Sequence, residues 1–252
     1  MTPQYVLRTE GLCRQFGTFK ANSDVSIALP HGARHALIGP NGAGKTTLIN
    51  MLTGVLPPSA GQVFLREENI TSLPQSVRVK RGLTRTFQIN TLFWGLTVLE
   101  SVLLAICERK GVATAWWRPL SQRTEEIEEA MTLLRQLHLE RDAQRITRSL
   151  PYGRQRLVEI ALALATKPSV LLLDEPAAGI PAGESREIFE VLAALPSDVS
   201  ILFIEHDMDI VFRFAQRITV LVGGKVLTDG TPAEIASDPR VKEVYLGESE
   251  HV

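Results

Sequence analysis

The chain has 252 residues, of which 27 are Lys or Arg and 28 are Asp or Glu, so its formal net charge is −1. This balance gives no electrostatic reason to expect nucleic-acid binding, which usually shows as an excess or a patch of basic residues. A content of 44% hydrophobic and 22% charged residues is ordinary for a globular chain and excludes extended disorder and fibrous repeats. The length predicts one large domain with room for a sub-domain.

No apolar run approaches the roughly 18–20 uncharged residues that a membrane-spanning helix needs. The first residues lack a basic segment followed by an apolar one, so we expect no secretory signal and a cytoplasmic protein. Cys13 and Cys107 lie far apart and outside any metal-ligand spacing, which predicts two free thiols.

The first part of the chain predicts strands over residues 5–8, 25–29 and 35–38, the second of them alternating in polarity. A helix is expected to begin at Lys45 and to run without a breaker to Gly54. Strand, glycine-rich turn and helix therefore follow one another in that order.

The middle of the chain, from about residue 90 to residue 166, has apolar residues at helical spacing. Helices are predicted over 98–106 and 124–138, and Thr97 and Glu100 have the spacing of a capping box. We interpret this region as a helical sub-domain. Between these helices lie Trp116 and Trp117, for which packing on the sub-domain is favoured over a partner contact.

Strand signals return after Lys167. The short apolar runs 170–173 and 201–204 are typical of central parallel strands buried on both faces. Residues 218–222 and 225–227, joined by two glycines, predict a hairpin. A last helix is expected to begin at Thr231, followed by Pro232 and by Glu234 as the third helical residue.

A phosphate-binding loop is predicted at residues 39–46, which read GPNGAGKT and match G-x-x-x-x-G-K-[ST]. The glycines let several backbone N–H groups converge on one anion, and the N-terminus of the following helix favours negative charge. Lys45 is expected to reach the β- and γ-phosphates and the Thr46 hydroxyl to bind Mg²⁺. The alternative, a chance glycine-rich turn, is disfavoured by the strand–turn–helix context. The candidate phosphate-binding residues are Gly39, Asn41, Gly42, Ala43, Gly44, Lys45, Thr46 and Thr47.

Acidic and histidine side chains follow the two later apolar strands. Asp174 suits a Mg²⁺ ligand, directly or through water, and Glu175 is placed to polarise an attacking water. The alternative is a pair of solvated turn carboxylates. His206, after the other strand, is expected to hold that water or the transition-state charge; alone it would more often be a structural histidine.

The sequence motifs of GTP-binding proteins and of protein kinases are absent. The guanine-reading pattern [NT]-K-x-D is absent, because the only Thr-Lys continues as Pro-Ser at 168–169, and no kinase-type H-R-D or D-F-G occurs. ATP hydrolysis is therefore the leading chemistry.

Taken together, the motifs resemble those of the ATP-binding subunits of ABC transporters over nearly the whole chain. In order they are the loop at 39–46, TRTFQ at 84–88, LPYGRQR at 150–156, DEP at 174–176, and His206. Further features resemble the branched-chain amino acid importers: RTFQ followed by GLTVLE at 95–100, the insert at 111–123, Tyr152-Gly153, PAAG at 176–179 and YLG at 245–247.

This resemblance implies an α/β fold: a P-loop NTPase core with a mainly parallel sheet, an N-terminal antiparallel β sub-domain and an inserted helical sub-domain. We place the core with its β sub-domain at 1–89 and 160–252, and the helical sub-domain at 90–159. The resemblance also implies that Phe16 stacks on adenine and that Gln88 joins Thr46 and Asp174 at Mg²⁺, acting in catalysis beside Glu175 and His206. Without it, Phe16 would be taken as a core or turn aromatic.

The partners are implied in the same way. Two ATP-binding subunits would sandwich ATP head to tail, so that each site uses the loop of one chain and the signature segment of the other. Transmembrane permease subunits would dock near the Gln88 loop and the helical sub-domain and hold the chain at the cytoplasmic face of the inner membrane. A solute-binding protein would act indirectly, and no nucleic acid is expected.

Two departures from the family pattern suggest asymmetry. The usual signature L-S-G-G-Q reads LPYGR at 150–154, which removes the serine hydroxyl, and Pro181 replaces the usual Asp or Asn. The resemblance implies that both positions serve the partner's ATP, whereas Phe16, Lys45 and Glu175 serve this chain's own. We therefore hypothesise a heterodimer with two unequal sites, with a homodimer as the alternative.

Two other functions stay open. One is an ABC-type ATPase of translation or DNA repair, although those proteins usually carry two P-loops or a long coiled coil, and this chain has neither. The other is a non-hydrolysing regulatory subunit, suggested by the altered signature. The transported solute cannot be identified from this chain.

Overall fold

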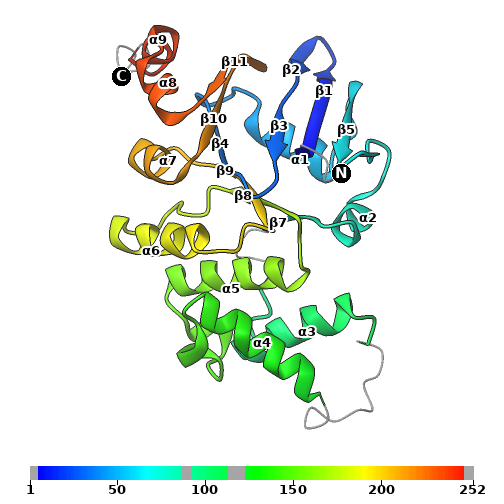
Figure 1. Cartoon of the computed structure of the whole chain (residues 1–252), viewed down its shortest axis with the longest axis vertical. Helices are drawn as coiled ribbons and strands as arrows, with labels where there is room; N and C mark the ends of the chain where they lie inside the picture. Colours follow the sequence, from blue (N-terminus) through cyan, green and yellow to red (C-terminus); the bar gives the residue numbers. More distant parts are fainter. Residues whose placement is uncertain (1–4, 87–91, 113–122, 247–252) are drawn as a thin grey trace.

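The computed structural model describes residues 5–86, 92–112 and 123–246. Gln88, Trp116, Trp117 and Gly247 lie outside these described residues, so the predictions made for them stay predictions. The described chain forms two sheets and a group of helices at one end of the molecule (Figure 1).

The central sheet has six strands in the order β11-β10-β4-β9-β8-β7. All neighbours are parallel except β10 and β11, which form a hairpin. Residues 170–173 of β8 and all of β9 are buried, as their apolar runs predicted, and β4 is buried throughout as well. The strands are β4 (Arg34–Ile38), β7 (Leu83–Arg85), β8 (Val170–Asp174), β9 (Ser200–Ile204), β10 (Arg217–Val222) and β11 (Lys225–Gly230).

The second sheet is antiparallel, with β2-β1-β5-β6 in order and β3 also paired with β1. Its strands are β1 (Tyr5–Phe16), β2 (Phe19–Val25), β3 (Ala28–Pro30), β5 (Ala60–Leu65) and β6 (Glu68–Asn69). The first strand is longer than the predicted 5–8, and β2, β5, β6 and β7 were not predicted.

The prediction of one strand over 25–29 is wrong. Val25 ends β2, which pairs with the second half of β1, whereas β3 begins at Ala28 and pairs with the first half. Between them, Ser26 Oγ accepts a hydrogen bond from the Gly11 N–H, and the Ile27 N–H donates to Thr9 Oγ1. These two side-chain hydrogen bonds, together with the backbone bond from the Thr9 N–H to the Ile27 carbonyl oxygen, therefore connect the chain to β1 where it passes from one strand to the next.

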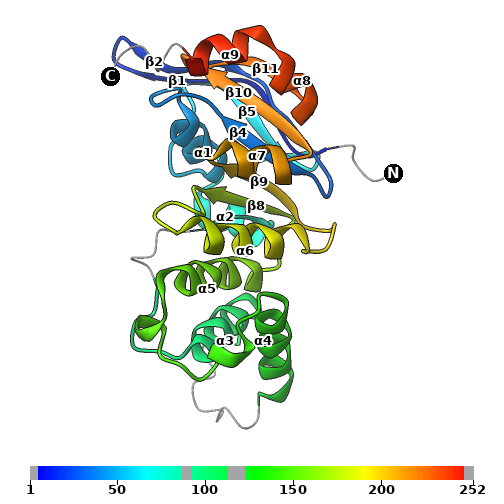
Figure 2. The ribbon, with the colours of Figure 1, turned by 90° about the vertical axis from the view of Figure 1, so that its left-hand side faces the viewer.

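The helices are α1 (Lys45–Thr53), α2 (Gln75–Lys80), α3 (Val98–Arg109), α4 (Thr124–Gln136), α5 (Tyr152–Ala165), α6 (Ala182–Ala193), α7 (Met208–Phe214), α8 (Pro232–Ser237) and α9 (Pro239–Leu246). Figures 1 and 2 place α5 between α6 and the α3–α4 pair, at the end away from the antiparallel sheet. None of the helices in the described residues is long and apolar enough to cross a membrane.

Several local predictions are confirmed. Capping boxes begin α3 at Thr97 and α8 at Thr231, and the hairpin turns at Gly223 and Gly224, whose φ angles of 53° and 77° suit a tight turn. Both cysteines are free. The helix predicted to end at residue 138 ends at Gln136, and His138 has a φ of +55° that a helix cannot contain.

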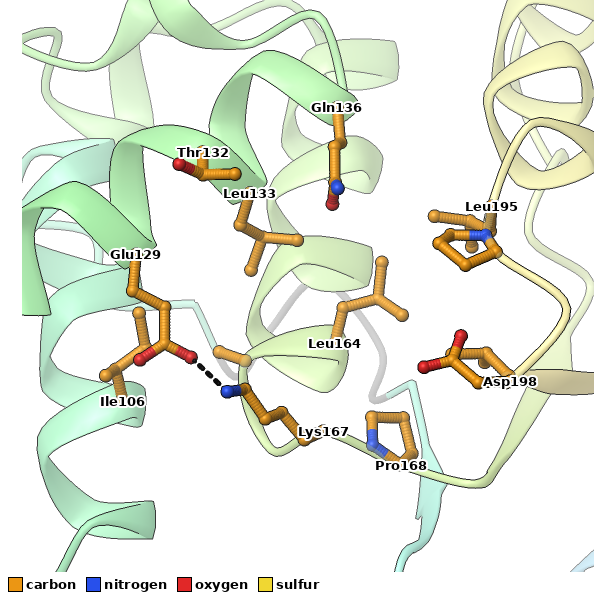
Figure 3. Close-up of a pocket in the computed structure, with 13 residues that line it drawn as sticks. Ile106, Glu129, Thr132, Leu133, Gln136, Leu164, Lys167, Pro168, Leu195 and Asp198 are labelled. Atoms are coloured by element: carbon orange, nitrogen blue, oxygen red, sulfur yellow. Dashed lines mark ion pairs between the residues drawn. The ribbon is translucent and has the colours of Figure 1, made fainter.

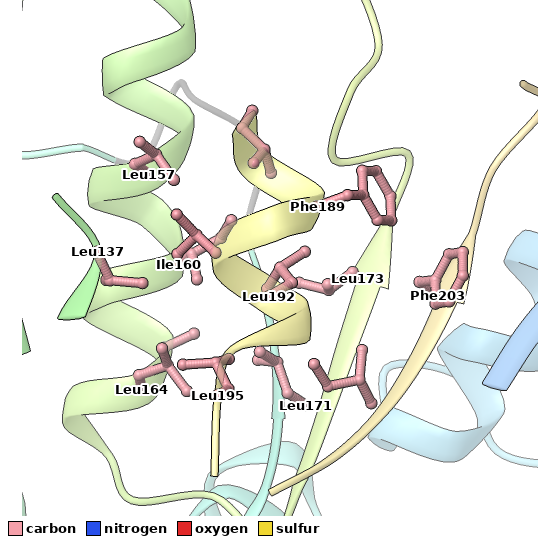
Figure 4. Close-up of a cluster of buried hydrophobic side chains, with 14 of the residues drawn as sticks. Leu137, Leu157, Ile160, Leu164, Leu171, Leu173, Phe189, Leu192, Leu195 and Phe203 are labelled. Atoms are coloured by element: carbon pink, nitrogen blue, oxygen red, sulfur yellow. The ribbon is translucent and has the colours of Figure 1, made fainter. Parts of the chain in front are cut away.

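The core joins the central sheet to the helical end. In Figure 4, Leu171 and Leu173 of β8 and Phe203 of β9 face α6, with α5 on the other side of that helix. The Phe189 ring of α6 meets the Phe203 ring edge to face, with centroids 5.3 Å apart. These apolar contacts hold α5, and with it the signature segment, against the sheet.

Candidate functional site

The carboxyl ends of β4, β9 and β8 form one edge of the central sheet, because Leu37 and Asp174 both lie in register with Ile204. The loop 39–44 follows β4, His206 follows β9, and Glu175 follows β8. Ligands of open α/β sheets bind at this edge. The topology therefore brings the predicted phosphate, metal and catalytic residues of the described chain to one place.

The phosphate-loop glycines are required by the backbone. Gly39 has a φ of 152°, and a Cβ there would lie 2.0 Å from the Leu221 carbonyl oxygen. Gly44 has a φ of 95° and directly precedes α1, where no side chain caps the helix. The first N–H groups of α1 thus meet the loop uncapped, as an anion site at a helix N-terminus requires.

Lys45 is buried at the start of α1, and its Nζ donates to the carbonyl oxygens of Gly39 at 2.7 Å and Pro40 at 3.0 Å. Its ammonium group therefore connects the start of α1 to the first two residues of the loop. Asn41 and Thr46 are exposed, whereas Ala43 is buried and accepts a backbone hydrogen bond from Gly224. The side chains of Asn41 and Thr46 therefore face outward, while Ala43 fixes the loop to the core.

Asp174 at the end of β8 is held by a residue whose role the sequence reasoning missed. Arg85 Nη2 lies 2.5 Å from Asp174 Oδ2, and Arg85 Nη1 donates to Asn50 Oδ1 of α1 at 2.7 Å. In the sequence, Arg85 stands out only as one residue of the family motif at 84–88. The ion pair forms because β7 lies beside β8. No sequence pattern near Arg85 predicts that these two strands are neighbours.

Glu175 and His206 are brought together. Glu175 Oε1 lies 2.8 Å from His206 Nε2, and both side chains are nearly half exposed. Glu175 has a φ of +50°, which turns its side chain away from that of Asp174 at the strand end. A carboxylate supported by an imidazole can accept a proton from water.

A third acid, Glu205, lies buried behind this pair. It accepts hydrogen bonds from the backbone N–H groups of Ala177 at 2.9 Å and His206 at 3.2 Å. Burial raises the pKa of Glu205, although these hydrogen bonds oppose the shift. Glu205 thereby ties the loops after β8 and β9 together.

Phe16 is exposed at the end of β1 and does not lie in the core. The Arg14 guanidinium lies over its ring, 4.7 Å from the centroid. The same hairpin reaches the phosphate loop, where Asn22 Nδ2 of β2 donates to the Gly44 carbonyl oxygen at 3.3 Å. An open aromatic face near a phosphate loop fits base stacking, which stays a prediction here.

The signature segment forms the N-terminus of α5. Pro151 precedes the helix without a capping side chain, and Tyr152 is exposed. Gly153 is buried and faces α6, where the side chain of the exposed Glu184 lies against it. Arg154 donates to the His138 carbonyl oxygen at 2.6 Å and thus points back to the helical end.

The residues present fit Mg²⁺. Asp174 uses only Oδ2 in its ion pair, and within the described chain neither Asp174 Oδ1 nor the exposed Thr46 hydroxyl makes a hydrogen bond. Hard oxygen ligands that leave room for water and phosphate are those that Mg²⁺ prefers. No group of three or more His, Cys, Asp or Glu in the described residues is arranged for another metal site.

A separate cleft of about 490 Å³ lies between α4 and the connection from α6 to β9 (Figure 3). Lys167 Nζ pairs with Glu129 Oε1 at 3.0 Å on one side of it. Pro168 and Val199 line it and precede β8 and β9, so the cleft lies at the amino ends of these strands, opposite the candidate site. We therefore do not assign it to nucleotide binding.

Comparison with known proteins agrees with this geometry. Residues 22–178 match the ABC transporter family model, and residues 225–251 match the model of the branched-chain amino acid ATP-binding cassette transporter. The high-affinity branched-chain amino acid transport ATP-binding protein LivG of Salmonella typhimurium is 39% identical, covering 98% of this chain and 99% of that protein. BraF of Pseudomonas aeruginosa, described in the same words, is 38% identical, with 97% and 98% covered.

Solved structures give the same result. The ADP conformation of MJ1267, an ATP-binding cassette of an ABC transporter, superposes with a TM-score of 0.84 at 34% identity and covers 96% of this chain and 99% of that one. The expected fold class, a P-loop NTPase core with an antiparallel sheet and added helices, is confirmed. With its phosphate loop, acidic strand end and histidine at one sheet edge, this chain belongs to the ABC transporter family, as an ATP-binding and ATP-hydrolysing subunit.

Proposed function

We propose that this chain hydrolyses ATP to power an importer of branched-chain or related amino acids. The observation that carries the proposal is the Glu175–His206 contact of 2.8 Å at the sheet edge that bears the phosphate loop. The substrate class rests on the names of LivG and BraF and on the C-terminal family match. Neither a DNA-repair ATPase nor a non-hydrolysing subunit is favoured by these relatives.

In the proposed mechanism, the loop N–H groups and Lys45 bind the phosphates, and Phe16 stacks on adenine. Mg²⁺, held by Thr46, Gln88 and Asp174, would neutralise phosphate charge when bound. Glu175 takes the proton of the attacking water. His206 orients Glu175 and faces the charge that develops on the phosphoryl group.

An apolar groove supports docking of permease subunits. It measures about 670 Å³, lies between α3 and α5, and is also lined by Leu92 and Phe93. Phe93 and Leu104 line it and are more than two-fifths exposed. An exposed apolar groove of this kind fits an amphipathic segment of a partner. Docking there would hold the chain at the cytoplasmic face of the inner membrane, with residues 90–159 as its helical sub-domain.

The proposal is tested by reconstitution. The chain, its permease subunits and its second ATP-binding subunit are placed in proteoliposomes with the solute-binding protein, and ATP hydrolysis is measured with leucine, isoleucine, valine and unrelated solutes. We expect hydrolysis that rises with branched-chain amino acids and disappears in Lys45→Ala. Hydrolysis that no amino acid stimulates would contradict the substrate class, and a lack of hydrolysis in every combination would contradict the catalytic role.

A further inference from the structure

Arg85 connects the elements that carry the proposed metal ligands. It ends β7, and its guanidinium contacts Asp174 of β8 at 2.5 Å and Asn50 of α1 at 2.7 Å. The proposed ligand Thr46 lies four residues before Asn50, on the same face of α1. The proposed ligand Gln88 lies three residues after Arg85 in the sequence. One side chain thus spans from the helix of Thr46 to the strand of Asp174.

The geometry needs an arginine. A guanidinium offers donors in a planar fork and can reach two acceptors in fixed directions, whereas a lysine ammonium acts as a single point charge. Arg85 uses one terminal nitrogen for each partner. It takes only Oδ2 of Asp174, so that Oδ1, which has no hydrogen bond within the described residues, can face a hydrated metal ion.

This pair is better shielded than an ordinary surface ion pair. The side chains of Arg85 and Asp174 are each 20% exposed, whereas those of the surface pair Arg81 and Glu68 are 36% and 52% exposed. Exposed pairs contribute little because water screens them and both side chains lose freedom. The Arg85 contact is therefore able to fix the orientation of the Asp174 carboxylate.

We propose that Arg85 is a positioning residue for Mg²⁺: it sets the spacing between Thr46 and Asp174 and keeps Asp174 Oδ1 turned toward the metal. This inference rests on the proposed function, since it requires that Mg²⁺ and nucleotide bind at this edge. Side chains that orient metal ligands typically contribute 10–100-fold to metal affinity, roughly the range expected here.

The test separates metal binding from nucleotide binding in the full chain. A fluorescent ATP analogue is bound first without divalent metal and then during titration with MgCl₂. We expect Arg85→Ala to raise the Mg²⁺ concentration for half-maximal enhancement about tenfold, with metal-free affinity changed less than about twofold. Arg85→Lys should behave nearly as Arg85→Ala, because an ammonium cannot hold both partners. Asn50→Ala, which keeps the ion pair, should shift the midpoint in the same direction by less.

Arg81→Ala is the matched control, since its ion pair lies away from the site, and its midpoint should equal that of the wild type. Thermal unfolding of each variant verifies folding. If Arg85→Ala needs less Mg²⁺ than the wild type, Arg85 competes with the metal, and the inference is overturned. If Arg85→Ala needs the same Mg²⁺ concentration as the wild type, Arg85 does not position the metal ligands, and the inference is overturned as well. Full rescue by lysine overturns it as well. A wild-type chain that binds ATP without any response to Mg²⁺ would overturn the proposed metal site itself.

Discussion

At the scale of single residues, Glu175 is held in a left-handed conformation that costs a non-glycine residue about 1–3 kcal/mol. Its N–H donates to the Ile204 carbonyl oxygen and its carbonyl accepts from the Ala178 N–H, so the turn is fixed on both sides. Backbone strain of this kind persists where the surrounding contacts determine it. Here it directs the carboxylate toward His206 and away from Asp174.

Replacing His206 by Ala should slow hydrolysis and spare binding. The imidazole contacts Glu175 but, in the described chain, makes no hydrogen bond to the phosphate loop. We expect single-turnover hydrolysis to fall about a hundredfold or more, with ATP affinity within about twofold of the wild type. The exposed His31 lies outside the site, and His31→Ala should leave both values unchanged. Equal losses of affinity and rate would place His206 in binding instead.

Glu159 in α5 should make stability depend on pH. Its side chain is buried, and Arg156 Nη1 donates to Oε2 at 2.8 Å. Among the described residues, none donates a hydrogen bond to Oε1. Burial raises the pKa of Glu159, although Arg156 opposes the shift. The folded chain therefore binds this proton more tightly than the unfolded chain, and its contribution to stability is lost as the pH rises from about 4.5 through the raised pKa.

Urea unfolding between pH 4 and pH 8 tests this. The free energy of unfolding of the wild type, minus that of Glu159→Gln, should fall as the pH rises. Glu126 is a control for which the opposite pH dependence is expected. Its hydrogen bond with Lys110 lowers the pKa of Glu126, so the contribution of Glu126 to the free energy of unfolding is lost as the pH falls. For Glu126→Gln the same difference should rise with pH, or not change. A rising difference for Glu159 would show that Arg156 outweighs burial.

At the scale of elements, the C-terminus of α1 depends on Arg78 from α2. Its buried guanidinium donates to the carbonyl oxygens of Met51 at 2.8 Å and Leu52 at 2.6 Å, and also to those of Leu73 and Thr71. Burial lowers the pKa of Arg78 to about 10, and α1 has no basic residue in its own last turn. The positive charge that stabilises the C-terminus of α1 is therefore supplied by Arg78 of α2 and not by a residue of α1.

Arg78→Met should destabilise the fold by about 3 kcal/mol, because it leaves buried carbonyl groups without a donor. Urea unfolding of the nucleotide-free chain measures this loss. Arg81→Met, at a partly exposed position three residues on, should stay within about 0.5 kcal/mol of the wild type. A loss below about 1 kcal/mol for Arg78→Met would mean that water replaces the guanidinium.

Elements whose signals are local could be predicted from the sequence. The glycine-rich loop, the caps at Thr97 and Thr231 and the apolar strands carry their own chemistry within a few residues. Contacts between distant segments could not, since the break after Val25 depends on hydrogen bonds to β1 and the role of Arg85 depends on β7 lying beside β8. The site residues were therefore named from motifs, whereas the residue that links them was not.

At the scale of the whole molecule, the residues of the candidate nucleotide site and the signature segment lie in different parts of the chain. The loop, Asp174, Glu175 and His206 lie at one sheet edge, whereas the signature segment lies at the start of α5, the helix that packs between α6 and the α3–α4 pair (Figure 1). The second group departs from the family pattern: Pro151 stands in the serine position, beside an exposed Tyr152. The serine hydroxyl of the family signature, which would donate to the γ-phosphate in the partner's site, is therefore absent.

A complex of this chain with a second ATP-binding subunit should therefore hydrolyse ATP mainly at this chain's own loop. Glu175→Gln in this chain alone should remove most steady-state ATP turnover of the reconstituted complex, because it disables the site that keeps its own catalytic residues. The corresponding change in the partner should leave most of the turnover, since that site depends on the altered signature segment. Glu243→Gln, at an exposed position in α9, serves as the control for loss of a carboxylate. If Glu175→Gln in this chain changes turnover little, or if both subunits' variants lose it equally, the two sites are not unequal in the way that the signature segment suggests.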